Sequence, residues 1–309
     1  MAAAPHCNAH TRLPPGEAAT HLQHTLHELS DPHMATTRGT QKSYRNDDFL
    51  NSPEARAIRI LAEYYEPLQR FRRNQIQDTI VFFGSARLRS RDESVRRRDE
   101  LLASANRHDD HGPSKDLLEQ LRAAEQQVEM SRYYEDAVEL ARLLSVWSVS
   151  LKNKRFVICS GGGPGIMEAA NKGAQQAGAQ SIGLNISLPF EQDSNPYIPP
   201  DLNLEFHYFF MRKFWFVYPA KALVAFPGGF GTMDELMEVL TLVQTQKLRK
   251  TVYIVLYGSE FWKRIINFPA LAEMGLISEE DLDLFHFSDS PDEASAWLQE
   301  KLTNGYLSR

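Results

Sequence analysis

The stretch Ala222-Leu-Val-Ala-Phe226, continued by Pro227-Gly-Gly-Phe-Gly-Thr-Met-Asp-Glu235, decides the fold of this chain. A short continuous apolar run is typical of a strand that is buried on both faces, as in a parallel sheet. The glycine-rich turn after it leads into a periodicity that predicts a helix over 231–246. A buried strand, a glycine turn and a helix in this order indicate an α/β fold.

Four other stretches repeat the apolar run, and helical patterns separate most of them. The strands are expected at Asp78–Gly84, Arg155–Cys159, Ser181–Ile186 and Val252–Leu256, and the helices at 131–150, 164–177, 209–219 and 259–272. This alternation predicts a Rossmann-like, doubly wound parallel sheet with helices on both faces.

Two additions to this core are expected. Ser52-Pro53-Glu54 resembles a helix start with proline at the first position, and it predicts an N-terminal helix that runs to about Phe71. The polar stretch 88–130, after the first strand, mixes arginines with acids such as Asp92 and Glu93. We interpret it as a solvated helical insertion, and binding of RNA or phosphate by its arginines stays open as the alternative.

Composition limits the class of protein. The chain has 309 residues, a net charge of −6 and two cysteines, Cys7 and Cys159. These values argue against a protein stabilised by disulfides and against one that coats nucleic acid without sequence preference. They favour a reducing, cytoplasmic location. No apolar run approaches the ~20 residues that span a bilayer. Residues 1–46 hold six of the ten histidines and few aliphatic residues, so we expect a disordered tail before a single domain at 47–309.

Three predicted strand ends carry glycine-rich turns. They begin at Gly84, Gly161 and Gly228, and the carboxyl ends of parallel strands meet at one edge of a sheet. Glycines let a ligand approach the backbone, and a helix N-terminus offers free N–H groups to an anion. Together the turns predict a phosphorylated ligand. Neither a Walker A lysine nor the spacing of a dinucleotide-binding fingerprint is present, which weakens both of these cofactor interpretations.

Glu235 allows two interpretations. Thr232-Met-Asp-Glu235 has the spacing of a capping box, which would explain the glutamate structurally. Alternatively, its carboxylate faces the ribose of a nucleotide and stabilises the transition state of glycosidic cleavage. Arg212 and Lys213 stand in a run of aromatic residues, where they either snorkel from a buried helix or hold a phosphate or carboxylate.

The motifs resemble those of the LONELY GUY family. Pro227-Gly-Gly-Phe-Gly-Thr-Met-Asp-Glu235 matches its P-G-G-x-G-T-x-x-E motif, Met211-Arg212-Lys213 its arginine-lysine helix, and Ser160-Gly-Gly-Gly-Pro-Gly-Ile-Met-Glu-Ala-Ala-Asn171 its second glycine turn. The resemblance covers roughly 47–270, and Leu188-Pro-Phe-Glu-Gln192 is similar to the longer bacterial branch. Members have often carried the name "lysine decarboxylase", for which this sequence offers no lysine in a suitable context.

The resemblance implies a phosphoribohydrolase, which cleaves a nucleoside 5′-monophosphate to free base and ribose 5-phosphate. The base would be an ordinary one, as in AMP, or the N6-substituted adenine of a cytokinin. By motif match, Arg212 and Glu235 would be the catalytic pair. The expected substrate-binding residues are Gly228, Gly229, Gly231, Thr232, Lys213, Gly162, Gly163, Met167, Ser85 and Thr241.

The resemblance also implies partners. Members are at least dimers, so a homodimer or larger homo-oligomer is expected, with 231–246 as a candidate contact. No metal, cofactor, nucleic acid or membrane is expected. The alternative function is a non-enzymatic carrier of a nucleotide-type cofactor, similar to a molybdenum-cofactor carrier, and the sequence leaves the identity of the base open.

Overall fold

The computed structural model describes residues 41–105, 114–151, 155–188 and 193–308. Its contacts divide the chain into two units, 1–56 and 57–309. The first unit contains the helix α2 (Asp47–Leu50), where the Asn46 side chain accepts a hydrogen bond from the Phe49 N–H. The predicted histidine-rich tail lies almost entirely outside the described residues, and a domain start at residue 47 stays a prediction.

The second unit contains a seven-stranded parallel sheet with the order β4-β3-β2-β1-β5-β6-β7. This confirms the predicted fold class. The strands are β1 (Thr79–Phe83), β2 (Val157–Ser160), β3 (Ser181–Ile186), β4 (Asn203–Phe206), β5 (Ala220–Ala225), β6 (Tyr253–Tyr257) and β7 (Phe285–Ser288).

The two edge strands, β4 and β7, were not predicted. Each has only four residues, and polar side chains interrupt the apolar pattern, as Glu205 does in β4 and His286 in β7. Edge strands have a neighbour on one side only, so their sequences do not need the continuous apolar run that marks β1 or β5.

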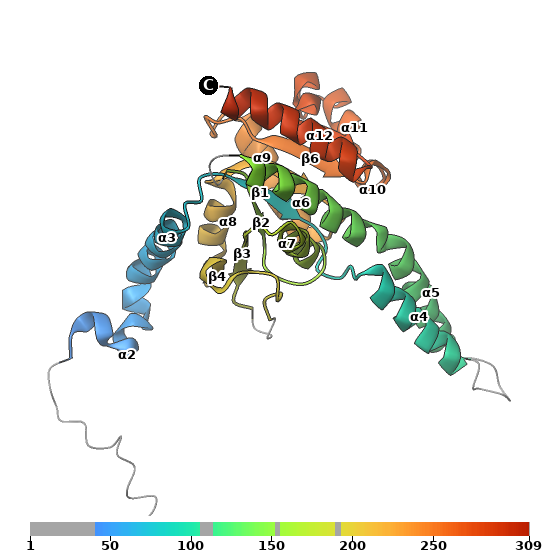
Figure 1. Ribbon diagram of the computed structural model, residues 1–309, viewed down its shortest axis with the longest axis horizontal. Coiled ribbons are helices and arrows are strands. Elements are labelled where there is room, and N and C mark those ends of the chain that lie inside the picture. Colours follow the sequence, from blue (N-terminus) through green and yellow to red (C-terminus); the bar gives the residue numbers. More distant parts are fainter. Residues whose placement is uncertain (1–40, 106–113, 152–154, 189–192, 309) are drawn as a thin grey trace, which may run out of the picture. The chain divides into compact units, whose positions relative to one another are not determined.

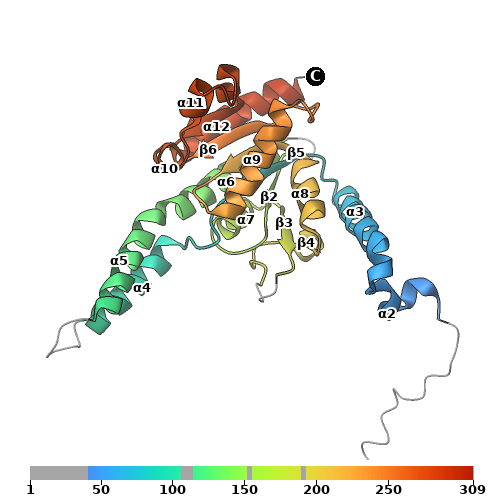
Figure 2. The ribbon, with the colours of Figure 1, turned by 180° about the vertical axis from the view of Figure 1, so that it is seen from behind.

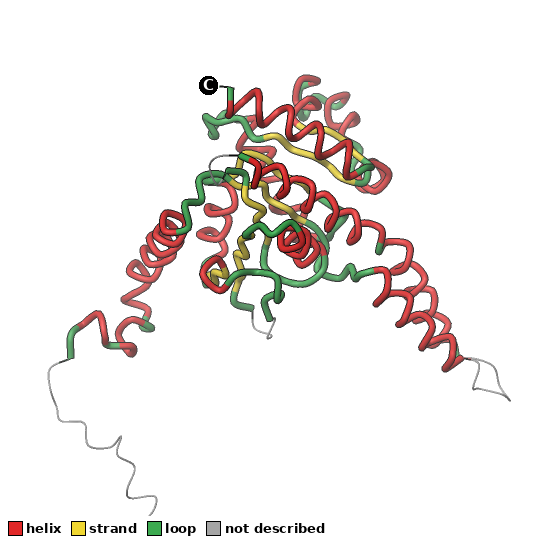
Figure 3. Tube along the Cα trace, viewed as in Figure 1, coloured by secondary structure: helices red, strands yellow, loops and turns green. Residues whose placement is uncertain are grey.

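Side chains of the central strand alternate between two apolar cores. In β1, Val81 and Phe83 belong to the core under α8 (Phe209–Val217) and α9 (Phe230–Gln244). Ile80 and Phe82 belong to the core under α6 (Arg132–Ser150), α7 (Ile166–Gln176) and α12 (Pro291–Leu302). Strands therefore lie between helical layers, which can be followed as yellow between red in Figure 3. Figures 1 and 2 show the layers from opposite sides, with α9 in front in Figure 2.

The predicted helices are found with small shifts of their ends, and one prediction is corrected. The expected helix over 259–272 is two helices, because the side chain of Asn267 accepts from the Ala270 N–H and starts a new helix with proline in its first turn. Apart from the two helices of the insertion, the α-helices described in this unit are α3 (Arg56–Arg73), α6 (Arg132–Ser150), α7 (Ile166–Gln176), α8 (Phe209–Val217), α9 (Phe230–Gln244), α10 (Ser259–Ile265), α11 (Phe268–Glu273) and α12 (Pro291–Leu302).

The polar insertion forms two helices, α4 (Arg91–Ala105) and α5 (Lys115–Met130), which lie side by side in both views. Leu88, 4% exposed, anchors the start of the insertion in the core that contains Tyr133 and Tyr134. The expected helical insertion after the first strand is thereby confirmed.

The helix α3 holds α8 in place from the outside. Its Glu63 carboxylate accepts from the backbone N–H groups of His207 and Tyr208, at 2.8 and 3.2 Å, just before α8 begins. The Glu63 carbonyl accepts from Trp215 Nε1 at 2.9 Å. A carboxylate at a helix N-terminus is electrostatically favourable, so α3 fixes both the start and the rotation of α8.

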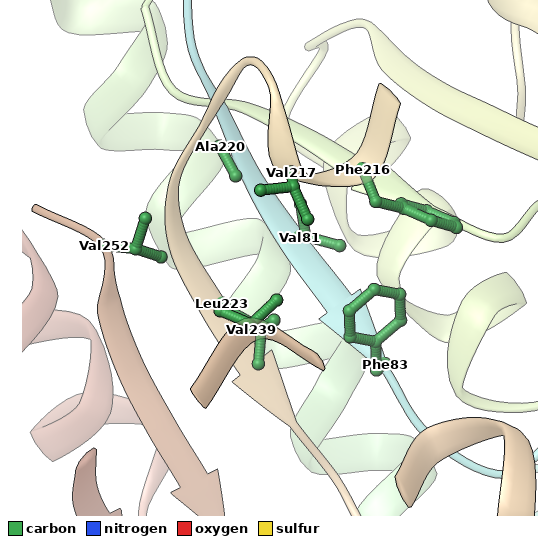
Figure 4. Close-up of a pocket in the computed structure, with 8 residues that line it drawn as sticks. All are labelled: Val81, Phe83, Phe216, Val217, Ala220, Leu223, Val239 and Val252. Carbon is green, nitrogen blue, oxygen red and sulfur yellow. The ribbon is translucent and has the colours of Figure 1, made fainter. Parts of the chain in front are cut away.

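The interior beside β1 and β5 encloses a small cavity of about 10 Å³ (Figure 4). Its eight lining residues are all apolar, and Figure 4 shows Phe83 and Phe216 at one end of it. A space of this size without polar partners is a packing gap rather than a ligand site. Among the described residues, no helix is long and apolar enough to cross a membrane.

Candidate functional site

The structure brings the three glycine turns together at one edge of the sheet, because β2, β1 and β5 are neighbours. The Ser85 N–H donates to the Pro227 carbonyl at 3.0 Å and joins the first turn to the third. The Ile166 N–H donates to the Ser85 carbonyl, also at 3.0 Å, and joins the second turn to the first. The turns therefore form one continuous backbone surface.

A pocket of about 1010 Å³ opens over these turns. Its polar and glycine lining comes from the first and third turns, from Gly161 of the second, and from the side chains of Arg212 and Glu235. Its apolar lining comes mainly from α8, α9 and α10 and includes Phe83, Met167, Phe209, Phe216, Phe230, Met233, Met237, Phe261, Ile265 and Ile266. A large concave site with a few converging polar groups is the usual form of a small-molecule site.

The third turn differs from the predicted capping box. The helix α9 begins at Phe230 with Gly229 as its N-cap, and no side chain caps it. Thr232 is thus already inside the first turn, and a Cβ built on Gly228 would lie 2.1 Å from Thr232 Oγ1. The capping-box interpretation is wrong, because it assumed a helix start at Thr232, and it no longer explains Glu235.

Glu235 is a buried carboxyl group, with 7% of the residue exposed. Burial raises its pKa to about 7, although the charges of Lys213 and Arg212 act in the opposite direction. Its Oε2 lies 3.6 Å from Lys213 Nζ. A carboxyl group with this environment in a pocket is a candidate for proton transfer or charge stabilisation near neutral pH.

Arg212 lies in the same pocket and is held from two sides. Its Nε donates to the Leu184 carbonyl at 2.7 Å, and its guanidinium lies 5.0 Å from the ring centre of Phe216. A Cβ on Gly161 would come within 2.6 Å of its Nη2, so this glycine makes room for the arginine. Burial lowers the pKa of Arg212, and the negative charge of Glu235 acts against that shift.

Lys213 points to α9 and is not among the residues that line the pocket. Its Nζ contacts Asp234 at 2.8 Å and Glu238 at 2.9 Å, besides Glu235. Burial disfavours its charge, but hydrogen bonds to Asp234 and Glu238 outweigh this effect and raise its pKa. In this structure Lys213 links α8 to α9, and its expected contact with substrate stays a prediction.

The second turn is mostly enclosed. Gly162 and Gly163 are buried, and their carbonyls accept from the side-chain amide of Asn195 at 3.0 and 3.1 Å. The same amide donates to Asn171 Oδ1 at 2.9 Å, and Asn171 also accepts from the Ser160 hydroxyl at 2.7 Å. Only Gly161 and Met167 of this motif reach the pocket.

Of two other residues expected to bind substrate, one lines the pocket and one does not. Ser85 lines the pocket and accepts the Arg87 N–H on its hydroxyl at 3.1 Å. Thr241 is exposed, donates to the Met237 carbonyl and is not a lining residue.

Several pocket residues were missed from the sequence. Phe216 shares one face of α8 with Arg212, a spacing that could have identified it. Phe261 and Ile265 belong to α10, whose position no local pattern reveals. Among the described residues, no cluster of three or more histidine, cysteine, aspartate or glutamate side chains could hold a metal ion.

Comparison with known proteins gives one family and several structures. The family model described as "Possible lysine decarboxylase" matches residues 167–298. No curated protein matches the sequence. Solved structures that match include the X-ray structure of TM1055, with 18% identity, a TM-score of 0.43, and coverage of 72% of this chain and 99% of that chain. Another is a molybdenum cofactor carrier protein from Chlamydomonas reinhardtii, with 17% identity, a TM-score of 0.40, and coverage of 74% and 99%.

Proposed function

We propose that the chain belongs to the LONELY GUY family, because the family match agrees with the resemblance of the motifs, and that it hydrolyses nucleoside 5′-monophosphates. The bond cleaved is the N-glycosidic bond, and the products are the free base and ribose 5-phosphate. The candidate substrates are AMP and the monophosphate of a cytokinin riboside. A cytoplasmic location is part of the same proposal.

The observation that carries this proposal is the buried carboxyl group of Glu235 beside a glycine-rich pocket. Its burial has no capping role to explain it, because α9 begins five residues earlier at Phe230. Burying an ionisable group is costly, and such costs are typical of functional sites. A non-enzymatic carrier would not need a carboxylate there.

The phosphate of the substrate is placed by this proposal at the N-terminus of α9. Gly229 and Gly231 have open space where a Cβ would be, so an anion can approach the backbone N–H groups directly. The positive end of the helix dipole favours an anion at this position. Arg212, fixed through Leu184, has further guanidinium donors for the ribose or the phosphate.

With the phosphate at α9, the ribose lies near Glu235, one helical turn farther along. In its ionised form the carboxylate stabilises the positive charge that develops at C1′ as the bond to the base breaks. It also orients a water molecule toward C1′, and the water proton passes to the carboxylate. The departing base takes up one proton in exchange, so one water molecule is consumed and the carboxylate returns to its ionised form. The base leaves toward the apolar part of the pocket, formed by residues such as Phe209 and Phe261.

The name of the matched family suggests another reaction, decarboxylation of lysine. Pyridoxal-phosphate chemistry of that kind uses a lysine that forms a Schiff base. The described lining of the pocket includes no lysine, and Lys213 instead binds three acids of α9. The site therefore supports glycosidic hydrolysis better.

The test is a product assay with the full chain. The protein is incubated with AMP, isopentenyladenosine monophosphate and adenosine, and free base and ribose 5-phosphate are quantified by chromatography. We expect equal amounts of the two products from at least one monophosphate and little release from adenosine. Absence of base release from a panel of nucleoside monophosphates would contradict the proposal, and tight retention of uncleaved nucleotide would favour the carrier.

We propose further that the chain forms a homodimer or larger homo-oligomer, with α9 as a contact. Phe230, at its start, is 96% exposed, and Met237, two turns on, is 37% exposed. Exposed apolar side chains of this kind are typical of contact surfaces. Sedimentation of the wild type and of Phe230→Glu tests this: the variant should be smaller, and an unchanged mass would exclude this contact.

A further inference from the structure

The charged side chains of the pocket differ in their ion-pair partners. Four of them line it, namely Arg87, Arg212, Asp234 and Glu235. Asp234 is paired with Lys213 at 2.8 Å, and Glu235 Oε2 lies 3.6 Å from the same Lys213 Nζ. Among the described residues, neither Arg87 nor Arg212 has an acidic side chain within ion-pair distance, and Arg87 is the exposed one of the two.

Two neighbouring arginines are paired with acids. Arg89 lies 3.8 Å from Glu93, and Arg98 lies 2.6 Å from Asp99. Neither of them lines the pocket. Among the described arginines of this segment, Arg87 is therefore the one that lines the ligand space, and no acidic side chain holds its guanidinium.

The backbone at Arg87 is held in place. Its N–H donates to Ser85 Oγ, and Ser85 is tied through its own N–H to Pro227 in the third turn. The next residue, Leu88, is buried in the core on the other side. An exposed guanidinium on a fixed backbone loses less freedom on binding than one on a loose loop.

We propose that Arg87 is a second anion-binding residue of this pocket, which contacts the phosphate of the ligand beside the N-terminus of α9. This assignment rests on the proposed function, because it takes a sugar phosphate as the ligand. A guanidinium suits this role, since its paired N–H groups match two oxygens of one phosphate. Arg87 would thus determine specificity for the monophosphate over the unphosphorylated nucleoside.

The experiment measures binding without turnover. The dissociation constant of ribose 5-phosphate is determined by calorimetry for the wild type, Arg87→Ala, Arg87→Lys and the matched control Arg89→Ala. Arg87→Ala should weaken binding about tenfold or more, the size expected for one lost hydrogen bond between charged groups. Arg87→Lys should lie between this variant and the wild type, and Arg89→Ala should match the wild type. Thermal melts confirm that all variants fold, as expected for an exposed side chain.

Unchanged binding in Arg87→Ala, an equal loss in Arg89→Ala, or no binding by the wild type would overturn the assignment. A second readout uses turnover: in Arg87→Ala, KM for a monophosphate should rise while kcat stays near its wild-type value. If the wild type binds ribose 5-phosphate through Arg87 and yet releases no base from any nucleotide, the assignment holds and the hydrolytic function fails. The two claims can therefore be separated.

Discussion

The second and third glycine turns are similar in sequence and differ in what they do. In the second, Gly162 and Gly163 are buried and their carbonyls are held by Asn195. In the third, Gly229 and Gly231 are exposed, with open space around them, at the start of α9. A glycine-rich motif can thus serve close packing or close approach of a ligand. The hydrogen-bond partners of its backbone distinguish the two.

The largest expected effect is on catalysis at the third turn. Glu235→Gln keeps the size of the side chain and removes its charge, so base release should fall by about 100- to 1000-fold. Glu238→Gln is the matched control, because Glu238 contacts the same Lys213 and does not line the pocket. Initial rates with saturating nucleotide compare the variants. Similar rates in wild type and Glu235→Gln would leave the third turn without a catalytic role.

Next in size is an effect on stability at the second turn. Asn195→Ala removes the amide that binds Gly162, Gly163 and Asn171, and it leaves their buried oxygens without this donor. We expect the free energy of unfolding to fall by about 2–4 kcal/mol. Urea denaturation measures it. A decrease in the free energy of unfolding no larger than that of an ordinary surface substitution would mean that the hydrogen bonds of Asn195 do not hold this turn.

Glu235→Gln should also change the free energy of unfolding. In contrast to Asn195→Ala, it should increase this free energy above pH 7. The folded-state pKa of about 7 lies above the value of 4.5 for an unperturbed glutamate, so the folded state binds more protons between these values. Stability therefore decreases as pH rises from about 4.5 to 7, and above pH 7 the cost amounts to at most about 3 kcal/mol.

Replacement by glutamine removes this cost at pH 8 and has little effect at pH 4. Thermal melts of both proteins at the two pH values provide the comparison. A variant that is less stable than the wild type at pH 8 would show that the carboxylate is a structural group.

The smallest expected effect on stability is that of Gly231→Ala. Nothing lies within 4 Å of a Cβ at this position, and the residue is inside α9. Alanine should leave stability unchanged or raise it by up to about 1 kcal/mol. Nucleotide binding, measured by calorimetry, should nevertheless weaken, because the methyl group would occupy the space of the phosphate. Unaltered affinity would move the phosphate away from this turn.

The centre of the fold was predictable from the sequence, and its edges were not. The strands β1, β2, β3, β5 and β6 are buried on both faces, and their apolar runs reveal them. At the site, Arg212 and Glu235 were expected together from the resemblance of the motifs, and both side chains line one pocket. The role of Thr232 was not predictable, because the same spacing suits a helix that begins there or at Phe230. The part of the pocket wall formed by α10 was not predictable either, because its position depends on packing between elements that are distant in the sequence.

The central claim is that Glu235 acts as a buried carboxylate, and the pH dependence of base release tests it most directly. In the measurement, kcat/KM for the best nucleoside monophosphate is followed between pH 5 and 9. Because the ionised form is the active one, kcat/KM should rise with pH through a midpoint near 7, following the raised pKa of Glu235. A profile that is flat across this range, or that falls with rising pH through 7, would contradict the account.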